Sequence, residues 1–490
     1  MAVLSLLLVA SWLLLACNAP DDGVKTADDA WAELSARIDA QITDARVPGF
    51  QVAVVVDGEL RYRGGFGVTE YGGDEAVTDD TVFRWGPVTQ MHTAAAVLSL
   101  VEDGAIDLHA PVADVIGAGF ELGHRVEGRE ITPWHLLTHT AALPDTVPEQ
   151  CNGGPEVLDT YVVNEWITYA PPGTFYNYSK TGFVWLGALL EAVTGQDYLD
   201  VMQERVFAPA GMETATMDAE VAEAGPHAIG TTWSRDAPWS YAPLTEYDCG
   251  WGRPAGWLHG TATDLARTAE WQLAGGGAVL TAESVAAMHG QADTHWFPDG
   301  SYRVGYGQFA QRHRGEELVF RAGWITGFGS AWAIVPGTGF GVVVVANADW
   351  ADPAAVMYDA VDLFLAPDGD TPDYTTDSET WSVYEGTYTD EHVYGRIEVT
   401  HDGGGLHAEF PDRGFSAELT QYAGDAFKLL FDDGSDTYVR FIADDSGVYR
   451  WFVTRAGVGD REAEPASEAW RGSGRSNGVT PRGPFSGGDR

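Results

Sequence analysis

The pattern of apolar and turn-forming residues changes near residue 381, and this change constrains the fold more than any other feature of the sequence. From there to about residue 460 the chain consists of short alternating stretches separated by turn residues such as Asp402-Gly403 and Asp433-Gly434. This spacing indicates a small antiparallel barrel or sandwich over 381–460. The expected strands include Gly395–His401, Gly405–Phe410, Ala426–Phe431, Tyr438–Ala443 and Val448–Thr454.

The segment 30–365 has a mixed pattern that predicts an α+β domain. Apolar residues at helical spacing begin at Ala30, and two strand-like runs, Phe50–Val56 and Leu60–Phe66, flank the hairpin signal Asp57-Gly58. A helix is expected over 88–103, further strands over Ser330–Val335 and Gly341–Ala346, and a closing helix over Pro353–Leu365. Residues 366–380, rich in Pro, Gly and Asp, predict a linker, and their acids lack the spacing of an EF-hand calcium loop.

The first residues predict export. Leu4–Leu15 is an apolar run too short to span a bilayer but suited to the core of a signal peptide. It ends in Leu14-Leu15-Ala16-Cys17, which resembles a bacterial lipobox, so we expect a signal peptide over 1–17, lipidation of Cys17 and a membrane-anchored lipoprotein that faces the periplasm or the cell exterior. No Lys or Arg precedes Cys17, and an ordinary cleaved signal peptide is the alternative. Residues 18–29 predict a tether, and residues 461–490 a disordered tail.

The charge of the chain restricts its partners. With 72 acidic residues against 28 basic ones, the net charge is −44, which disfavours nucleic acid and anionic lipid head groups as partners. Such acidity is typical of adaptation to salt, where screening weakens self-repulsion, and a compositional habit of the source is the other explanation.

Several sequence blocks occur in the order typical of one enzyme superfamily. They are Val82-Phe83-Arg84-Trp85-Gly86, then Ile131-Thr132-Pro133-Trp134-His135-Leu136-Leu137-Thr138-His139-Thr140 with Leu143-Pro144-Asp145, then Tyr178-Ser179 and Ala255-Gly256-Trp257-Leu258. In these blocks the chain resembles the serine β-lactamase and penicillin-binding-protein superfamily, which includes class C β-lactamases, D-alanyl-D-alanine carboxypeptidases and esterases. The resemblance implies an antiparallel sheet flanked by helices plus a helical subdomain, and 381–460 resembles the lipocalin-like barrel that often follows such domains.

The catalytic motifs of that family are altered in this chain. Where the family has Ser-x-x-Lys, the sequence reads Pro87-Val88-Thr89-Gln90, so the nucleophile and its lysine are absent. Proline also lacks the backbone N–H that forms part of the oxyanion hole. Tyr178-Ser179-Lys180 keeps the tyrosine of Tyr-x-Asn but not the asparagine, and Arg321-Ala322-Gly323 keeps the glycine but has Arg in place of Lys or His.

Other residues offer weak substitutes for the missing chemistry. Thr89 and Ser179 are the nearest hydroxyls, and His92 has no evident Asp partner. His135 and His139 stand at i, i+4, but no Glu follows His135 as in the zinc protease motif, and in the resembling family this block is structural. We therefore expect neither metal nor cofactor.

Three functions follow from these losses. The resemblance implies that Gln90, Tyr178, Lys180 and Arg321 line the former cleft, where the two cations would form a site for a carboxylate-bearing small molecule or a cell-wall peptide. The first hypothesis is therefore a binding or scaffold protein without catalysis, and the alternative is a serine hydrolase with a displaced nucleophile. The third is a structural envelope protein, in which Lys180 and Arg321 point to solvent or pair with carboxylates. In the resembling family Cys151 and Cys249 lie in segments that border the cleft, so a disulfide is expected, with two free thiols as the alternative.

Overall fold

The computed structural model describes residues 25–116, 130–143, 145, 168–232, 240–242, 250–370, 372–390, 393–402, 405–431, 436–455 and 457–462. The predicted signal peptide, the lipidation site Cys17, and both Cys151 and Cys249 lie outside these residues. No helix in the described part of the chain is long and apolar enough to cross a membrane.

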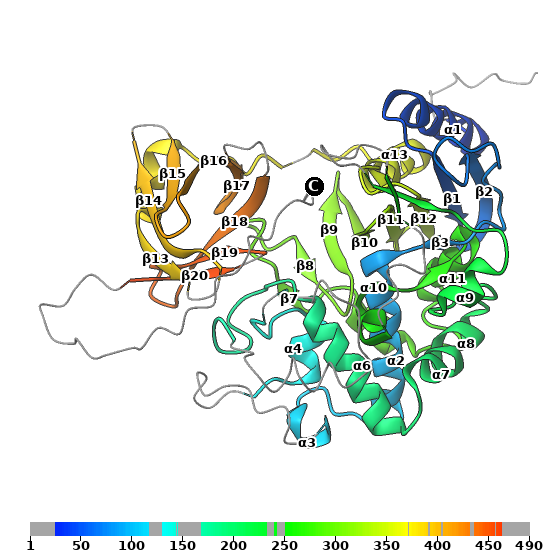
Figure 1. Cartoon of the computed structure of the whole chain (residues 1–490), viewed down its shortest axis with the longest axis horizontal. Helices are drawn as coiled ribbons and strands as arrows, with labels where there is room; N and C mark the ends of the chain where they lie inside the picture. The colour runs from blue at the N-terminus through cyan, green and yellow to red at the C-terminus, as the bar shows by residue number, and fades with distance from the viewer. Residues whose placement is uncertain are drawn as a thin grey trace, which may run out of the picture.

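An eight-stranded antiparallel sheet forms the centre of the first domain (Figure 1). Its order is β2-β1-β12-β11-β10-β9-β8-β7. The predicted hairpin is confirmed: Asp57 and Gly58 both have positive φ, as a tight turn between twisted strands requires. The strands are β1 (Gly49–Val56), β2 (Glu59–Gly67), β7 (Ala292–Asp293), β8 (Arg303–Val304), β9 (Phe309–His313), β10 (Glu316–Ile325), β11 (Phe328–Val335) and β12 (Phe340–Ala346).

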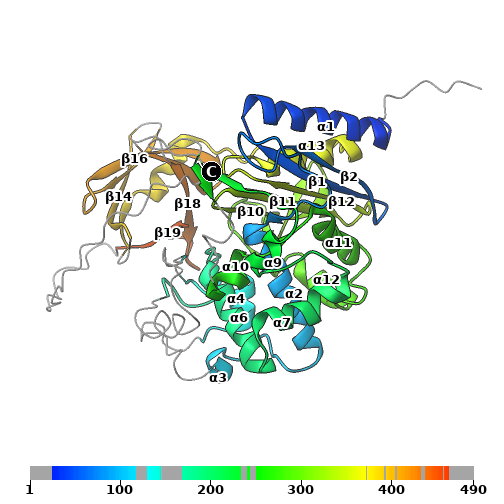
Figure 2. The ribbon, with the colours of Figure 1, turned by 45° about the vertical axis from the view of Figure 1, so that its right-hand side comes forward.

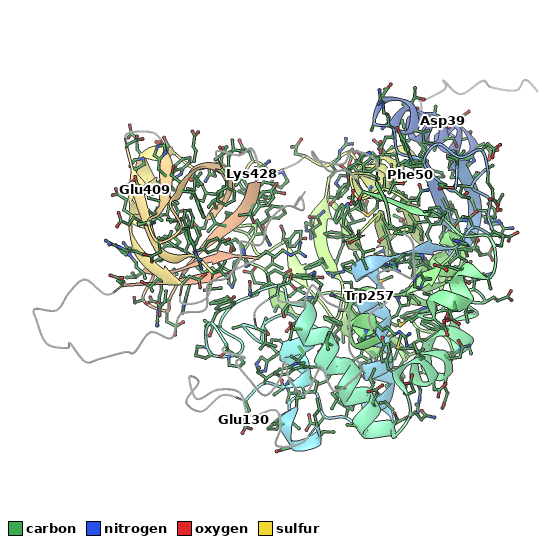
Figure 3. The ribbon with its side chains drawn as sticks, in the orientation of Figure 1. Asp39, Phe50, Glu130, Trp257, Glu409 and Lys428 are labelled. Carbon is green, nitrogen blue, oxygen red and sulfur yellow. The ribbon has the colours of Figure 1, made fainter. Side chains whose placement is uncertain are left out.

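Helices cover both faces of this sheet (Figure 2). α1 (Ala27–Asp44) and α13 (Pro353–Leu365) pack on one face, where Phe50 of β1, labelled in Figure 3, is fully buried. α2 (Thr89–Glu102), α6 (Lys180–Thr194) and α11 (Ala262–Leu273) lie on the other face with most of the remaining helices. Because both faces are covered, the central strands β1, β11 and β12 are buried along almost their whole length and mostly apolar, rather than alternating between apolar and polar residues.

The first helix begins earlier than the sequence pattern predicted. α1 starts at Ala27, so the predicted tether 18–29 overlaps it by three residues. The cause is local: the side chain of Thr26 accepts from the backbone N–H of Asp29, and the Asp29 side chain accepts from Thr26, which forms a capping box.

Short elements complete this domain. They are β3 (Phe83–Arg84) paired with β6 (His259–Gly260), β4 (Gly230–Thr232) paired with β5 (Ser240–Ala242), and the helices α3 (Ala113–Ile116), α4 (Pro133–Leu137), α7 (Tyr198–Met202), α8 (Ala208–Ala210), α9 (Ala219–Glu223), α10 (Arg253–Gly256) and α12 (Ala282–Met288).

The C-terminal domain is a closed antiparallel barrel, which confirms the predicted architecture (Figure 1). Aromatic side chains such as Tyr388, Phe427 and Phe452 fill its interior. A 3₁₀ helix, Ser378–Tyr384, precedes it and starts inside the predicted linker, where Asp377 caps its first turn. The strands are β13 (Gly386–Asp390), β14 (Gly395–His401), β15 (Leu406–Phe410), β16 (Phe415–Ala423), β17 (Ala426–Phe431), β18 (Asp436–Ala443), β19 (Tyr449–Thr454) and β20 (Val458–Arg461).

The outer surface of the barrel packs against the first domain through a buried interface. Phe175 and Trp451 meet edge to face, with ring centroids 5.6 Å apart, inside a small apolar cluster shared by both domains. Arg440 of β18 donates to the carbonyl oxygens of Tyr176, at 2.7 Å, and of Thr294. Its burial lowers the pKa of the Arg440 guanidinium to about 10. The barrel is therefore held in one place beside the domain that carries the altered motifs.

Candidate functional site

The altered motifs meet where the start of α2 approaches β10. Gly86, with a φ of +57°, leads into the 3₁₀ turn Gly86–Val88, which runs on into α2 and has Pro87 in its first turn. Proline fits there because its missing N–H would have no intrahelical acceptor. The hydroxyl of Thr89 secures the turn: it donates to the Gly86 carbonyl at 2.7 Å and accepts from the Leu258 N–H at 3.1 Å.

Strand β10 presents Arg321 and Gly323 to this turn. Side chains alternate along a strand, and both residues share the face of Val319, which contacts the helical core. A Cβ on Gly323 would lie 2.8 Å from Cδ of Pro87, so only glycine allows this approach. The proline ring thus fills the space between the start of α2 and β10.

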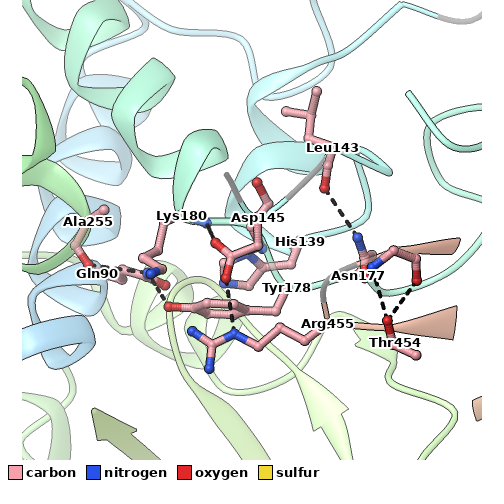
Figure 4. A network of polar contacts seen from close by, with 12 residues as sticks. Gln90, His139, Leu143, Asp145, Asn177, Tyr178, Lys180, Ala255, Thr454 and Arg455 are labelled. Atoms are coloured by element: carbon pink, nitrogen blue, oxygen red, sulfur yellow. Dashed lines mark hydrogen bonds and ion pairs between the residues drawn. The ribbon is translucent and has the colours of Figure 1, made fainter. Parts of the chain in front are cut away.

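Gln90, Tyr178 and Arg321 form one hydrogen-bonded network, although they come from distant parts of the chain. The Gln90 amide nitrogen donates to the Tyr178 hydroxyl at 2.8 Å and to the Ala255 carbonyl at 3.3 Å (Figure 4). Nη2 of Arg321 donates to the Gln90 amide oxygen at 2.7 Å and to the Tyr178 hydroxyl at 3.3 Å, and its Nε donates to the Pro87 carbonyl at 3.2 Å. Gln90 is fully buried, and Arg321 is 2% exposed.

Arg321 is therefore a buried cation that is solvated by neutral groups. No carboxylate of the described residues lies within ion-pair distance of its guanidinium. This contradicts, for Arg321, the alternative in which the residue points to solvent or pairs with a carboxylate. An unpaired buried charge is costly, and an anionic ligand would offset part of that cost.

The ring of Tyr178 lies between an imidazole and two guanidinium groups. The ring centroids of His139 and Tyr178 are 4.6 Å apart, and the guanidinium carbons of Arg321 and Arg455 lie 5.3 and 5.2 Å from the Tyr178 centroid. Nδ1 of His139 accepts from the Ser179 N–H at 3.1 Å, so its proton is on Nε2. Burial, helped by the charge of Arg321, holds the pKa of His139 well below its usual value, and the ring is neutral at pH 7.

Two further residues complete the site, and sequence reasoning assigned neither of them a role. Asp145, whose side chain is 5% exposed, accepts from the Lys180 backbone N–H at 2.9 Å and forms an ion pair at 3.0 Å with Nε of Arg455, next to β19 of the barrel (Figure 4). The ammonium of Lys180 has no hydrogen-bond or ion-pair partner among the described residues. Asp145 belongs to a quoted family block, whereas no sequence pattern pointed to Arg455.

The remaining candidate groups have structural roles. His92 is fully buried, contacts the Val88 carbonyl and the Thr268 hydroxyl, and burial lowers its pKa to about 4. His135 bonds to Thr132 in the cap of α4, and His139 packs against Tyr178. Within the described ranges, no cluster of His, Cys, Asp and Glu could hold a metal ion.

Comparison with known proteins places the fold and the family of the chain. The chain is 33% identical over 274 residues to penicillin-binding protein 4 of Amycolatopsis lactamdurans, spanning 53% of this chain and 69% of that protein. It is 29% identical over 347 residues to an unguisins hydrolase of Aspergillus campestris, spanning 66% of this chain and 63% of that protein. The crystal structure of SurE superposes with a TM-score of 0.66 at 24% identity, covering 89% of this chain and all of that chain.

A penicillin-binding protein homologue from Pyrococcus abyssi, described as octameric, superposes with a TM-score of 0.63 at 23% identity and covers 88% of this chain and 99% of its own. Residues 370–463 match a domain of unknown function, DUF3471, which coincides with the barrel. Residues 34–366 match the beta-lactamase family. The chain belongs to the beta-lactamase family, with a C-terminal antiparallel barrel.

Proposed function

We propose that this protein binds a ligand in the cleft of a beta-lactamase fold and does not hydrolyse it. One observation carries the proposal: Pro87 and Gln90 stand where the resembling family has its nucleophile and its lysine, and the Gln90 side chain is engaged in hydrogen bonds with Tyr178, Ala255 and Arg321. An amide cannot take up a proton as a base at neutral pH, and a proline offers neither a hydroxyl nor an N–H.

The nearby hydroxyl groups do not replace the nucleophile. Thr89 is buried and uses its hydroxyl within the turn. Ser179 is 3% exposed at the start of α6, and Nδ1 of the neighbouring His139 accepts from the Ser179 backbone N–H, so this nitrogen cannot at the same time take a proton from the hydroxyl. Removal of a serine hydrolase nucleophile costs on the order of 10⁶ in rate, and loss of an oxyanion donor alone costs about 10²–10³.

The charges around Tyr178 support a carboxylate-bearing ligand. Arg321, Lys180 and Arg455 surround the site, and the Asp145 carboxylate forms an ion pair with Arg455. This concentration of cations stands out in a chain with a net charge of −44 and only three lysines. A small carboxylate or a cell-wall peptide with a free C-terminus would meet these donors, and one relative is named a penicillin-binding protein.

We further propose that the protein acts in the cell envelope. The apolar run Leu4–Leu15 and the lipobox-like Leu14-Leu15-Ala16-Cys17 support export and a lipid anchor at Cys17, with scaffolding at the membrane as a further role. Expression with and without Cys17→Ala, followed by membrane fractionation and intact mass, tests this. A wild-type protein that stays soluble and carries no lipid would refute the anchor.

The test for catalysis is direct. The protein is incubated with a fluorescent penicillin and with an activated ester, and intact-mass spectra and product release are followed. We expect no stoichiometric adduct and no turnover above buffer. Turnover that Ser179→Ala abolishes would instead establish the alternative, a serine hydrolase with a displaced nucleophile.

The test for binding uses calorimetry with N-acetyl-D-alanyl-D-alanine. We expect Arg321→Leu to weaken binding at least about tenfold, because a charge-assisted hydrogen bond is lost, and Arg321→Lys to weaken it less. Arg450→Gln is the control: Arg450 forms an exposed ion pair with Asp460 on the barrel. Equal affinity in all variants would refute the anion site and favour the structural role.

A further inference from the structure

The C-terminal barrel contributes a residue to the candidate site. We propose that Arg455 is a positioning residue, which acts by orienting Asp145 and through it the start of α6, the helix that carries Lys180. The part of this inference that concerns ligand affinity rests on the proposed function. The part that concerns the order of α6 does not.

Asp145 is held by a different partner on each of its carboxylate oxygens. Its two oxygens have different fixed partners: Oδ1 accepts from the backbone N–H of Lys180 at 2.9 Å, and Oδ2 meets Nε of Arg455 at 3.0 Å. The carboxylate is 5% exposed, whereas the Arg455 side chain is 46% exposed. A carboxylate with one fixed donor on each oxygen has a single orientation, so Arg455 determines how Asp145 faces α6.

The bond from Lys180 to Asp145 secures the start of α6. The first N–H groups of a helix lack intrahelical acceptors and carry the positive end of the helix dipole, so a carboxylate there stabilises the first turn. The N-cap residue Ser179 makes no side-chain cap bond, which leaves this role to Asp145. Tyr178 immediately precedes the cap, and its ring lies between His139 and Arg455.

The barrel holds Arg455 firmly enough for this role. Arg455 follows Thr454, whose hydroxyl accepts from the Gly457 N–H at 3.0 Å, while the Thr454 N–H donates to the Gly457 carbonyl at 2.9 Å. The same strand carries Trp451, which packs on Phe175 of the first domain, and the neighbouring β18 carries the buried Arg440. Arg455 thus follows a residue that is fixed by two hydrogen bonds to Gly457, on a domain that is docked against the first.

The first experiment measures the order of α6 without any ligand. Hydrogen exchange is followed by mass spectrometry in a peptide that contains residues 180–184, for the full chain and for Arg455→Gln. We expect exchange of the first turn to accelerate about tenfold, the effect of weakening one charge-assisted hydrogen bond, and Arg455→Lys to restore most of the protection. Arg396→Gln is the matched control, because Arg396 lies on β14 of the same barrel and forms an exposed ion pair with Glu398. Unchanged exchange in Arg455→Gln would overturn the proposal.

A double-mutant cycle separates positioning from direct contact. Affinity for N-acetyl-D-alanyl-D-alanine is measured in Arg455→Gln, Asp145→Asn and the double variant. If Arg455 acts through Asp145, the second substitution adds less than about twofold to the loss caused by Asp145→Asn. A full additional loss in the double variant would show that Arg455 binds the ligand itself, and would overturn the positioning role. Altered exchange together with no binding by the wild-type protein would refute the proposed ligand and leave the positioning role standing.

Discussion

Restoring Ser-x-x-Lys at positions 87 and 90 should give weak acylation by a penicillin, and the charge of Arg321 beside position 90 should determine how this acylation depends on pH. Pro87→Ser supplies both a hydroxyl and a backbone N–H, and Gln90→Lys supplies a proton acceptor. Yet Nη2 of Arg321 lies 2.7 Å from the amide oxygen of Gln90, so the introduced ammonium would stand beside a buried guanidinium.

The size of that repulsion follows from the geometry. Two like charges about 4 Å apart cost about 4 kcal/mol at an effective dielectric of 20. At about 1.4 kcal/mol per pKa unit, this lowers the pKa of the introduced lysine by about 3 units, from about 10.4 to about 7.5. The folded-state pKa then lies below the unfolded value, so stability is lost as the pH falls below about 10, and the variant is destabilised at neutral pH. Above about pH 7.5 the amine is neutral and can act as the base.

The assay is labelling by a fluorescent penicillin between pH 6 and 9, with intact mass as the check on stoichiometry. We expect acylation by the double variant to rise with pH through about 7.5, little from either single variant because nucleophile and base act as a unit, and improvement on adding Lys180→Asn. Adding Arg321→His should raise the midpoint of the pH profile and recover stability. Wild-type acylation as fast as that of the triple variant would refute the assignment of these positions. A folded triple variant that never acylates would favour the structural role over ligand binding.

Three further outcomes follow from the sequence and the structure. A disulfide between Cys151 and Cys249 would stabilise by about 4–5 kcal/mol in the chain-entropy model, and two free thiols after denaturation without reductant would reject it. Between pH 6.5 and about 4 the unfolded chain protonates His92 and the folded protein does not, so the free energy of unfolding should decrease by about 1.4 kcal/mol for each unit by which the pH falls. Chemical denaturation of the wild-type protein and of His92→Asn at pH 7 and pH 5 measures this dependence. We expect a smaller decrease in the variant, and an equal decrease in both proteins would contradict the prediction. Raising sodium chloride from 0.1 to 1 M shortens the screening length from about 10 to about 3 Å, so the Tm of this chain of charge −44 should rise, and a constant Tm would argue against self-repulsion.

The elements that could be predicted from the sequence are those encoded locally. The Asp57-Gly58 turn fixes the register of its hairpin, and α13 has the bounds that its apolar pattern predicted, Pro353–Leu365. The start of α1 was misplaced because the apolar stripe does not report the capping box of Thr26 and Asp29. Hydrophobic periodicity locates the buried face of a helix, whereas side-chain hydrogen bonds determine its first residue.

The candidate site could be predicted only for residues that belong to sequence blocks shared with the family, because those blocks indicate which distant residues come together in space. Gln90, Tyr178 and Arg321 lie far apart in the sequence, and no periodicity brings them together; the resemblance did, and the structure joins them by hydrogen bonds. Arg455 could not be found in this way. Its place beside Asp145 depends on how the barrel docks, through contacts such as Phe175 with Trp451 that no local pattern specifies.

Pro87, Gln90 and Arg321, which replace family motif residues in the resemblance, are hydrogen-bonded to one another, and this bears on whether they were replaced independently. Independent decay of a catalytic site would leave buried polar groups unmatched, because each loss removes a partner that the others required. Here the two acceptors that face Arg321 from α2 and its preceding turn are the Gln90 amide oxygen and the Pro87 carbonyl, and both are used. A lysine at position 90 would repel Arg321, whereas the neutral amide accepts from it and donates onward to Tyr178. The glutamine at position 90 and the buried arginine at position 321 thus depend on each other physically, which favours coupled replacement of the two residues over independent drift.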